Sequence, residues 1–211
     1  MRANFERPLS QPRGARPGLS ILMPLLSNSL ARARLSRVQK YLGNRILDVG
    51  CGHAEILNYL PAGVELIVLL DRNPERQEKI KARVAQTKSQ VKFLIRDIEQ
   101  SEFDLNLTPF DTVVMAALLE HLKCPEVALK NIHKVMTAEG RLIVTTPSPL
   151  GGKLHGLGSY LGLVFAEAAH EHVRFYNRLA LSSLMLECGF LVEHYERFLL
   201  NLNQLVVARK I

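Results

Sequence analysis

A glycine-rich turn inside ILDVGCGHAEIL, residues 46–57, is where residue types and spacing first suggest a ligand. An apolar run leads into Gly50, Cys51 and Gly52, and a short helix is expected from there to Pro61. Glycines let a backbone approach a ligand closely, and a helix N-terminus offers unpaired N–H groups. The turn therefore predicts a nucleotide-like ligand at the carboxyl end of a strand.

The same turn differs from the turns that bind dinucleotides or nucleoside triphosphates. The dinucleotide fingerprint GxGxxG would need a third glycine at position 55, which is Glu55. A carboxylate at that place would repel a pyrophosphate. The GK[ST] sequence of a phosphate-binding P-loop is also missing from the turn.

Acidic side chains occur at the ends of three successive predicted strands. Asp48 belongs to the first strand, Asp71 ends the second, and Asp97 follows the third. A carboxylate at Asp71 can accept hydrogen bonds from two ribose hydroxyls, and Asp97 beside the apolar Ile98 suits an adenine. Together they predict an anionic edge that fits a cationic ligand and not a polyphosphate. The alternative is that these aspartates only cap helices or satisfy turns.

The elements that must position these residues alternate between strands and helices. Strands are expected at 45–49, 64–70, 91–96, 111–116, 141–146, 191–199 and 204–209, and helices at 74–86, 126–136 and 177–188. The last two strands are close enough to form an antiparallel hairpin. The order predicts an α/β fold, Rossmann-like and doubly wound, with a mostly parallel seven-stranded sheet that ends in an antiparallel strand.

Composition places the chain among ordinary globular proteins. It has 211 residues, of which 47% are hydrophobic and 22% charged, so it can bury a core without disulfides or a structural metal. Its three cysteines, Cys51, Cys124 and Cys188, have unrelated spacings, which indicates a reducing compartment and a cytoplasmic location. No apolar run reaches the length of a membrane-spanning helix.

The net charge of +7 lies within residues 1–40, where eight basic side chains face Glu6 alone, and the rest of the chain is neutral. Residues 1–18 are expected to form a basic flexible leader, and residues 19–43 a helical segment with a break near Pro24. That helix could pack on the following domain with its arginines in water, contact a membrane surface peripherally through residues 19–42, or belong to a cleaved transit peptide. The neutral remainder disfavours nucleic acid as a partner.

Several further motifs follow the glycine turn in a fixed order. They are Phe110-Asp111, Leu119-Glu120-His121-Leu122, Gly140-Arg141-Leu142-Ile143, Thr146-Pro147, His172-Val173-Arg174-Phe175-Tyr176 and Glu187-Cys188-Gly189-Phe190. With Asp48-Val49-Gly50-Cys51-Gly52 they make the chain, chiefly residues 44–147, similar to the class I S-adenosylmethionine-dependent methyltransferases. The closest resemblance is to the small-molecule branch called methyltransferase type 11. Two positions depart from the pattern: Ala54 replaces a glycine of the turn, and Arg141 replaces a glycine before the fifth strand.

The resemblance implies that residues 44–211 form a methyltransferase domain that binds S-adenosylmethionine. The residues expected at the cofactor are Asp48, Gly50, Cys51, Gly52, Asp71, Arg72, Asp97, Ile98 and Ala116. Gly50 and Gly52 would let the backbone run close to the methionyl part of the cofactor, and Asp48 would organise the turn. Asp71 would bind the ribose.

Methyl transfer from a sulfonium is an in-line displacement, for which the protein mainly supplies alignment and water exclusion. An acceptor that must lose a proton also needs a base. His121 is the candidate base, because the family places residues after the fourth strand beside the cofactor; it could instead only orient the loop. His172, with His170, is expected to contact the acceptor from a lid. No metal site is expected, because these two histidines and Glu171 lack a fourth ligand.

A glycine-rich apolar insertion at about 150–172 is expected to form that lid over the acceptor. With the amphipathic basic helix, it predicts a small-molecule or lipid-like, amphiphilic acceptor, although its leucines could simply cover the sheet edge. One alternative is an RNA or protein methyltransferase recruited by the basic N-terminus, and another is a non-catalytic cofactor-binding module. Ala116-Ala117-Leu118-Leu119 stands where amino-methylating nucleic-acid enzymes have an Asn-Pro-Pro-Tyr-like tetrapeptide, which disfavours the former. Asp71 and Asp97 disfavour the latter.

Overall fold

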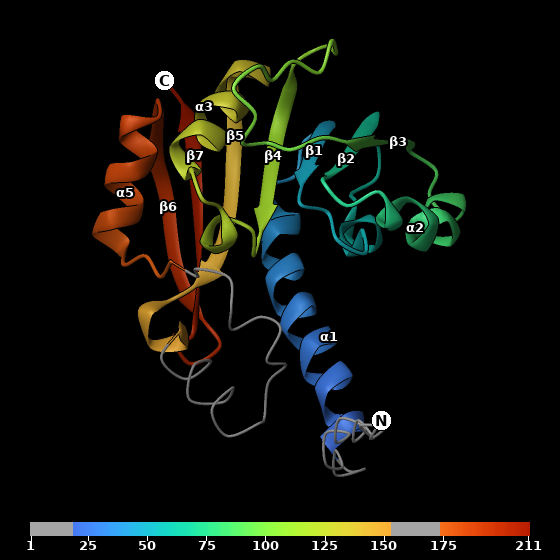
Figure 1. Ribbon diagram of the computed structural model, residues 1–211, viewed down its shortest axis with the longest axis horizontal. Coiled ribbons are helices and arrows are strands. Elements are labelled where there is room, and N and C mark those ends of the chain that lie inside the picture. Colours follow the sequence, from blue (N-terminus) through green and yellow to red (C-terminus); the bar gives the residue numbers. More distant parts are fainter. Residues whose placement is uncertain (1–18, 153–173) are drawn as a thin grey trace, which may run out of the picture.

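The computed structural model describes residues 19–152 and 174–211, with residues 19–28 described as backbone only. Its elements in chain order are α1 Leu19–Val38, η1 Gln39–Tyr41, β1 Arg45–Val49, η2 Glu55–Tyr59, β2 Leu66–Asp71, α2 Glu75–Ala85, β3 Gln90–Ile95, β4 Phe110–Ala116, η3 Leu119–His121, α3 Pro125–Val135, β5 Met136–Pro147, α5 Arg178–Glu187, β6 Phe190–Phe198 and β7 Asn203–Lys210 (Figure 1). The three η elements are 3-10 helices. The predicted basic leader and most of the predicted lid, including His170 and His172, lie outside the described residues.

The seven strands form one sheet in the order β3-β2-β1-β4-β5-β7-β6. Strands β1 to β5 run parallel, whereas β7 is antiparallel to both β5 and β6. The predicted fold class is therefore confirmed. Because parallel strands end at the same edge, the segments that follow β1, β2, β3 and β4 meet there. Figure 1 shows the N-terminal end of α1 and the β6–β7 turn at that same end of the molecule.

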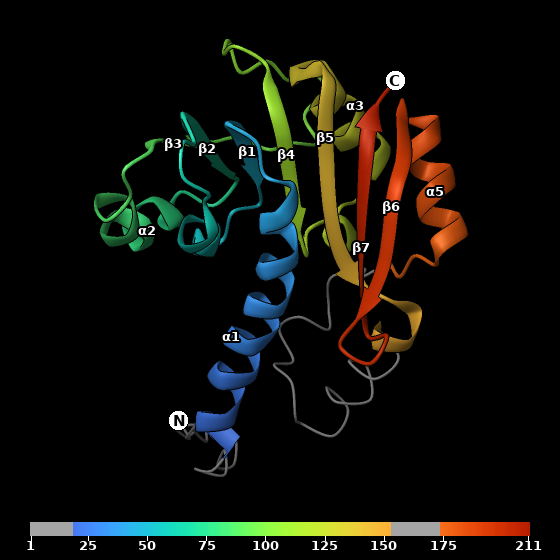
Figure 2. The ribbon, with the colours of Figure 1, turned by 180° about the vertical axis from the view of Figure 1, so that it is seen from behind.

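Apolar side chains fill both faces of the sheet, because the central strands are apolar at nearly every position. One buried cluster joins the sheet to α3 and α5, for example through Leu129 and Met185. The other joins it to α1, η2 and α2, for example through Val38, Ile56 and Ile80. Figure 2 shows the molecule from behind, with the carboxyl-terminal end of α1 beside β1 and β4 and the rest of the helix extending away from the sheet.

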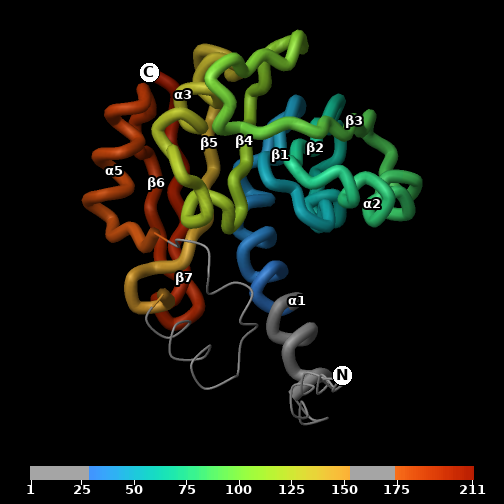
Figure 3. Tube along the Cα trace, in the orientation of Figure 1, coloured from blue at the N-terminus to red at the C-terminus, as the bar shows by residue number. Residues whose placement is uncertain are grey.

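Helix α1 is continuous from Leu19 to Val38, so the predicted break near Pro24 is wrong. A proline removes one N–H group and therefore one hydrogen bond, which does not end a helix that is long on its carboxyl side. The tube in Figure 3 shows the coloured, carboxyl-terminal part of this helix next to β1 and β4. Within the described residues, no helix is long and apolar enough to cross a bilayer.

The arginines near the end of α1 pack on the domain, which corrects the prediction that they lie in water. Both Nε and Nη2 of Arg34 donate to Oδ1 of Asn203 in β7, each over 3.3 Å. The Arg37 guanidinium lies 4.5 Å above the Phe198 ring and pairs with Glu196 at 3.0 Å. These contacts support the interpretation of α1 as a helix that packs on the domain.

Strand β5 begins at Met136, five residues before the predicted start at Arg141. Phe110 of β4 pairs with Met136, and Thr112 pairs with Arg141, so an irregularity separates the two pairs. Two helix ends lie within one residue of their predicted positions, because α2 begins at Glu75 and α5 ends at Glu187. Asn73 Oδ1 accepts from the N–H of Glu75, and Gly189 takes a φ of +84° after α5.

Candidate functional site

The glycine turn follows β1 directly and takes a left-handed backbone. The φ angle is +71° at Gly50, +54° at Gly52 and +52° at Ala54. The positive φ favours glycine at Gly50, and a β-carbon there would lie 2.8 Å from the end of the Leu118 side chain, which would have to move. Ala54 takes the same conformation with a β-carbon, which costs roughly 1–2 kcal/mol.

The short helix expected after this turn is present as the five-residue 3-10 helix η2. The N–H of Leu57 donates to the carbonyl of Ala54, three residues back, over 3.2 Å. The residues between the left-handed Ala54 and Pro61 are too few for a regular α-helix with its i→i−4 hydrogen bonds.

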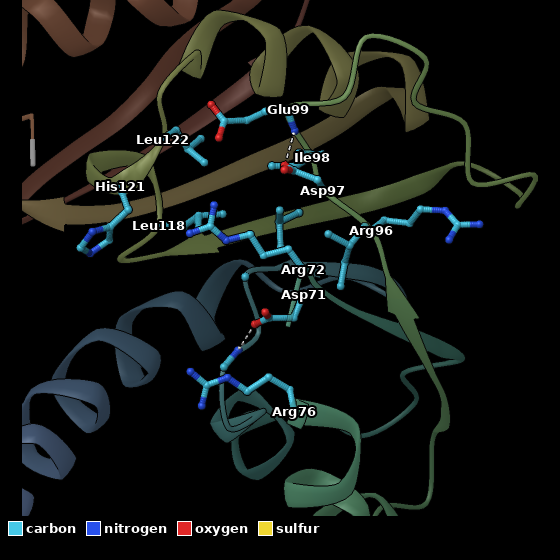
Figure 4. A pocket seen from close by; sticks show the side chains of 14 residues that line it. Asp71, Arg72, Arg76, Arg96, Asp97, Ile98, Glu99, Leu118, His121 and Leu122 are labelled. Carbon is cyan, nitrogen blue, oxygen red and sulfur yellow. Dashed lines mark hydrogen bonds between the residues drawn. The ribbon is translucent and has the colours of Figure 1, made fainter. Parts of the chain in front are cut away.

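Asp71 at the end of β2 ties the glycine turn to the next loop. Its Oδ2 accepts from the N–H of Gly52 over 3.1 Å, and its Oδ1 accepts from the N–H of Asn73 over 2.9 Å (Figure 4). The N–H of Gly50 also donates to the carbonyl of Leu70 over 2.8 Å. The turn is thus held from β2, and the carboxylate keeps free lone pairs because each oxygen can accept two hydrogen bonds.

The loop after β3 is held in a similar way. Asp97 Oδ1 accepts from the N–H of Glu99 over 2.9 Å. Asn131 of α3 donates through Nδ2 to the carbonyls of Ile98 and Gln100, both over 2.8 Å. Ile98 is buried against the apolar cluster under α3. The structure therefore brings Asp97 and Ile98 to the same sheet edge as Asp71.

A cavity of about 180 Å³ lies between these loops, and we call it the β2-side cavity. It is lined by Val49, Gly50, Gly52, Leu70, Asp71, Arg72, Arg76, Arg96, Asp97, Ile98, Glu99, Leu118, His121 and Leu122. Asp71, Asp97 and Glu99 are accompanied by three arginines, so this part of the predicted anionic edge carries charges of both signs. Of these arginines, sequence reasoning named only Arg72. Figure 4 shows Arg96 extending away from the other labelled side chains.

A second cavity of about 240 Å³ lies on the other side of the glycine turn, and we call it the α1-side cavity. It shares Gly50 and Gly52 with the first cavity. Its further lining residues are Leu30, Ala31, Arg34, Leu35, Asp48, Cys51, His53, Glu55, Ile56 and Ala116. One guanidinium and two carboxylates therefore meet beside the turn. Burial lowers the pKa of Arg34, while the charges of Glu120 and Glu55 act in the opposite direction.

Asp48 and Cys51 both titrate abnormally because they are buried at this turn. Burial, with the nearby charge of Asp71, raises the pKa of Asp48 to about 7. Burial, with the charges of Asp48 and Asp71, also raises the pKa of the Cys51 thiol. The thiol is therefore not activated as a nucleophile, and Cys51 is a small buried residue of the turn.

The turn after β4 carries the candidate base. His121 ends η3 and lines the β2-side cavity together with Leu118 and Leu122. Its N–H donates to the carbonyl of Leu118 over 2.9 Å. Among the residues that the structure describes, no group of three histidine, cysteine or acidic side chains can hold a metal ion.

The structure thus brings all nine predicted cofactor residues to the two cavities, together with His121. Sequence reasoning missed Arg34, Glu55 and Arg76. For Arg34 a signal was present: the apolar positions Leu30 and Val38 lie four residues on either side of it, so an arginine occupies the buried face of the helix. No sequence signal places Glu55 in the α1-side cavity or Arg76 in the β2-side cavity, because only the folded path of the chain around the turn brings them to these cavities.

The chain was compared with known proteins. A model of the family described as "Methyltransferase domain" matches residues 25–195, which is more than half of the chain. No protein of curated function matches the sequence.

Solved structures of methyltransferases share the fold. A putative methyltransferase from Bacillus halodurans C-125 has a TM-score of 0.62 and 22% identity, over 81% of this chain and 72% of that chain. Magnesium protoporphyrin IX methyltransferase from Synechocystis PCC 6803, with bound SAH, has a TM-score of 0.60 and 18% identity, over 89% and 83%. An S-adenosylmethionine-dependent methyltransferase from Mesorhizobium loti has a TM-score of 0.63 and 16% identity, over 83% and 96%.

These identities show a common fold and leave the acceptor open. The family match covers the glycine turn, both cavities and the turn after β4. The chain therefore belongs to the methyltransferase-domain family, which confirms the predicted class of S-adenosylmethionine-dependent methyltransferase.

Proposed function

We propose that this methyltransferase binds S-adenosylmethionine across both cavities and transfers its methyl group to a small-molecule or amphiphilic acceptor. The observation that supports the placement is that the two cavities share Gly50 and Gly52. A ligand that is a nucleoside at one end and an amino acid at the other needs two chemically different compartments. The glycines, which lack side chains, would leave room for the sulfonium between them.

The β2-side cavity suits the adenosine end. Asp71 Oδ1 and Oδ2 each accept one backbone N–H group and retain lone pairs for the two ribose hydroxyls. Asp97 would accept from the adenine amino group. Ile98, Leu118 and Leu122 would contact the flat faces of the ring.

The α1-side cavity suits the amino-acid end, because its charges complement a zwitterion. Arg34 would bind the α-carboxylate with its guanidinium. Glu55 and Asp48 would face the α-ammonium and the sulfonium. Cys51 and Ala116 provide small walls beside the turn. Arg72 would lie at the ribose, next to Asp71.

The proposal for the acceptor rests on the described surface near the mouth of the site. Leu150, Leu199 and Leu200 are 51%, 39% and 90% exposed, and they lie at the end of β5 and at the β6–β7 turn. Exposed leucines next to the carboxyl ends of the parallel strands favour an acceptor with an apolar part. Peripheral membrane contact through residues 19–42, a cytoplasmic location and the roles of His121 and His172 stay predictions.

The experiment that tests this function is methyl transfer from S-adenosylmethionine with a labelled methyl group to fractionated cell extract. Label is expected in a small-molecule or lipid fraction. Label confined to RNA or protein would contradict the acceptor class and support recruitment by the basic N-terminus. Binding of the cofactor without transfer to any fraction would support a non-catalytic module.

A further inference from the structure

Near the carboxyl ends of β4 and β5, several buried side-chain atoms meet no hydrogen-bonding partner among the residues that the structure describes. Besides Oγ1 of Thr145, they are Oε2 of Glu120, Oγ1 of Thr146 and the hydroxyl of Tyr176, and the last three are considered together. Glu120 is 2% exposed and Thr146 is 1% exposed. Burial of a polar atom without a partner is costly, so such atoms concentrate where a ligand completes them.

These side chains lie next to the cofactor cavities. Ala116, which lines the α1-side cavity, pairs with Thr145 of β5, and Thr146 is the next residue. Glu120 belongs to η3, which begins three residues after Ala116 and ends at His121 in the β2-side cavity. The three unpartnered groups therefore come from segments that border both parts of the proposed cofactor site.

The framework around these groups is fixed by hydrogen bonds to main-chain carbonyls. The carbonyl of Glu120 accepts from the N–H of Arg174 over 3.0 Å. Gln204 of β7 donates through Nε2 to the carbonyls of Tyr176 and Pro147, over 2.7 and 3.0 Å. The segment that carries Tyr176 is thus joined to η3, β5 and β7, so the three groups are held in place before any ligand binds.

An ion pair with Arg34 would be the simplest structural role for Glu120, and the geometry does not support it. The hydrogen bonds of the Arg34 guanidinium go to Asn203, and no ion pair within 4.0 Å joins Arg34 to Glu120 in the described part of the chain. Burial raises the pKa of Glu120, although its own backbone and the nearby His121, Arg34 and Thr146 lower it. The Thr146 hydroxyl thus lies beside this carboxyl and lowers its pKa.

We propose that Glu120, Thr146 and Tyr176 form the polar subsite for the methyl acceptor, and that Glu120 accepts the acceptor's proton in place of His121. The inference rests on the proposed function and adds the class of acceptor. The nucleophile is an N–H or O–H group that donates to the Glu120 carboxylate. An ionised carboxylate acceptor would be repelled by Glu120 and is excluded.

The reaction balances with this assignment. A lone pair of the acceptor nitrogen or oxygen forms a bond to the methyl carbon while the carbon–sulfur bond breaks. The electron pair of that bond goes to sulfur, and the sulfonium becomes a neutral thioether. The acceptor proton passes to Oε2 of Glu120, which releases it to water after the product leaves.

The test compares two cofactor analogues by calorimetry, so it needs no identified acceptor. S-adenosylhomocysteine carries no group at the methyl position, whereas sinefungin carries an ammonium group there. The full chain should bind sinefungin more tightly than S-adenosylhomocysteine. Glu120→Gln should lower the affinity for sinefungin about tenfold and the affinity for S-adenosylhomocysteine less than about threefold. The matched control is Glu139→Gln, at an exposed position of β5, which should change neither affinity.

The proposal would be overturned if Glu120→Gln lowered the affinity for both analogues equally, or if it lowered neither affinity. If Glu120→Gln does not fold, Thr146→Val and Tyr176→Phe replace it; both should weaken sinefungin selectively, and equal binding of both analogues would count against the subsite. Failure of the unmutated chain to bind S-adenosylhomocysteine would instead contradict the proposed function.

Discussion

Arg34 of α1 and Asn203 of β7 are 169 positions apart in the sequence, yet two hydrogen bonds of 3.3 Å join them beside the glycine turn. Through this pair the helix before the sheet becomes a wall of the α1-side cavity. Leu35 and Val38, which follow on the same helix, are buried in the adjoining apolar cluster. The sequence predicted every cofactor residue within residues 44–211. The structure adds α1, which precedes that range, to the lining of the site.

Asn203→Ala should destabilise the protein by about 1–3 kcal/mol, because it leaves a largely buried guanidinium without its hydrogen-bonding partner. Thermal unfolding measures the loss. Asn58→Ala, at an exposed position of η2, is the control and should leave the melting temperature unchanged. An unchanged melting temperature for Asn203→Ala would show that solvent satisfies Arg34.

Removal of residues 1–43 should abolish binding of S-adenosylhomocysteine and lower stability, because it removes Arg34 and exposes the side chains that Leu35 and Val38 cover. Removal of residues 1–18 is the matched control and should preserve both. Calorimetry and chemical denaturation measure the two effects. A fragment 44–211 that binds as the full chain does would place the whole cofactor site within that domain.

Asp48→Asn tests how the buried carboxyl couples to the cofactor. The pKa of Asp48 is raised to about 7, so the group is largely protonated below that pH and ionised above it. The positive charge of S-adenosylmethionine favours the ionised form, so affinity should rise as pH increases from about 6 to about 8. Asp48→Asn should remove most of this rise, as measured by calorimetry at several pH values.

The same group has the opposite effect on stability without ligand. Folding raises the pKa of Asp48 from its ordinary value of 3.8 to about 7, so the folded protein binds this proton more tightly than the unfolded chain does. Its contribution to stability is thus lost as pH rises towards about 7. Asp48→Asn should be more stable than the unmutated protein at about pH 8, by roughly 1–4 kcal/mol. Equal stability there would mean that Asp48 is not desolvated.

Gly50→Ala should impair both folding and binding. Gly50 has a φ of +71°, and its new β-carbon would meet Leu118 at 2.8 Å. Gly63→Ala is the matched control, because Gly63 has a φ of +88° and open space around it. Each change should cost about 1 kcal/mol through backbone conformation. Only Gly50→Ala should also weaken binding of S-adenosylhomocysteine, as measured by calorimetry. Equal binding by the two variants would contradict the claim that the contact with Leu118 matters.

The sequence predicted those features of the fold and site that depend on local pattern. The strand before Gly50 and the carboxylates at Asp71 and Asp97 follow from short-range chemistry. Arg34 could not be placed, because its partner Asn203 belongs to the last strand and only the closed sheet brings them together. The balance of charge in the β2-side cavity was missed for a similar reason: Arg76 reaches it from α2.

The placement of the cofactor across both cavities is tested most directly by calorimetry with two ligands. S-adenosylhomocysteine has both the adenosine and the amino-acid end, whereas methylthioadenosine has only the adenosine end. Asp71→Asn should weaken both ligands by about 1–3 kcal/mol. Arg34→Gln should weaken S-adenosylhomocysteine by a similar amount and leave methylthioadenosine unchanged, with Arg32→Gln, exposed on the same helix, as the control. Equal loss of both ligands in Arg34→Gln, or no loss of either, would contradict the two-cavity account.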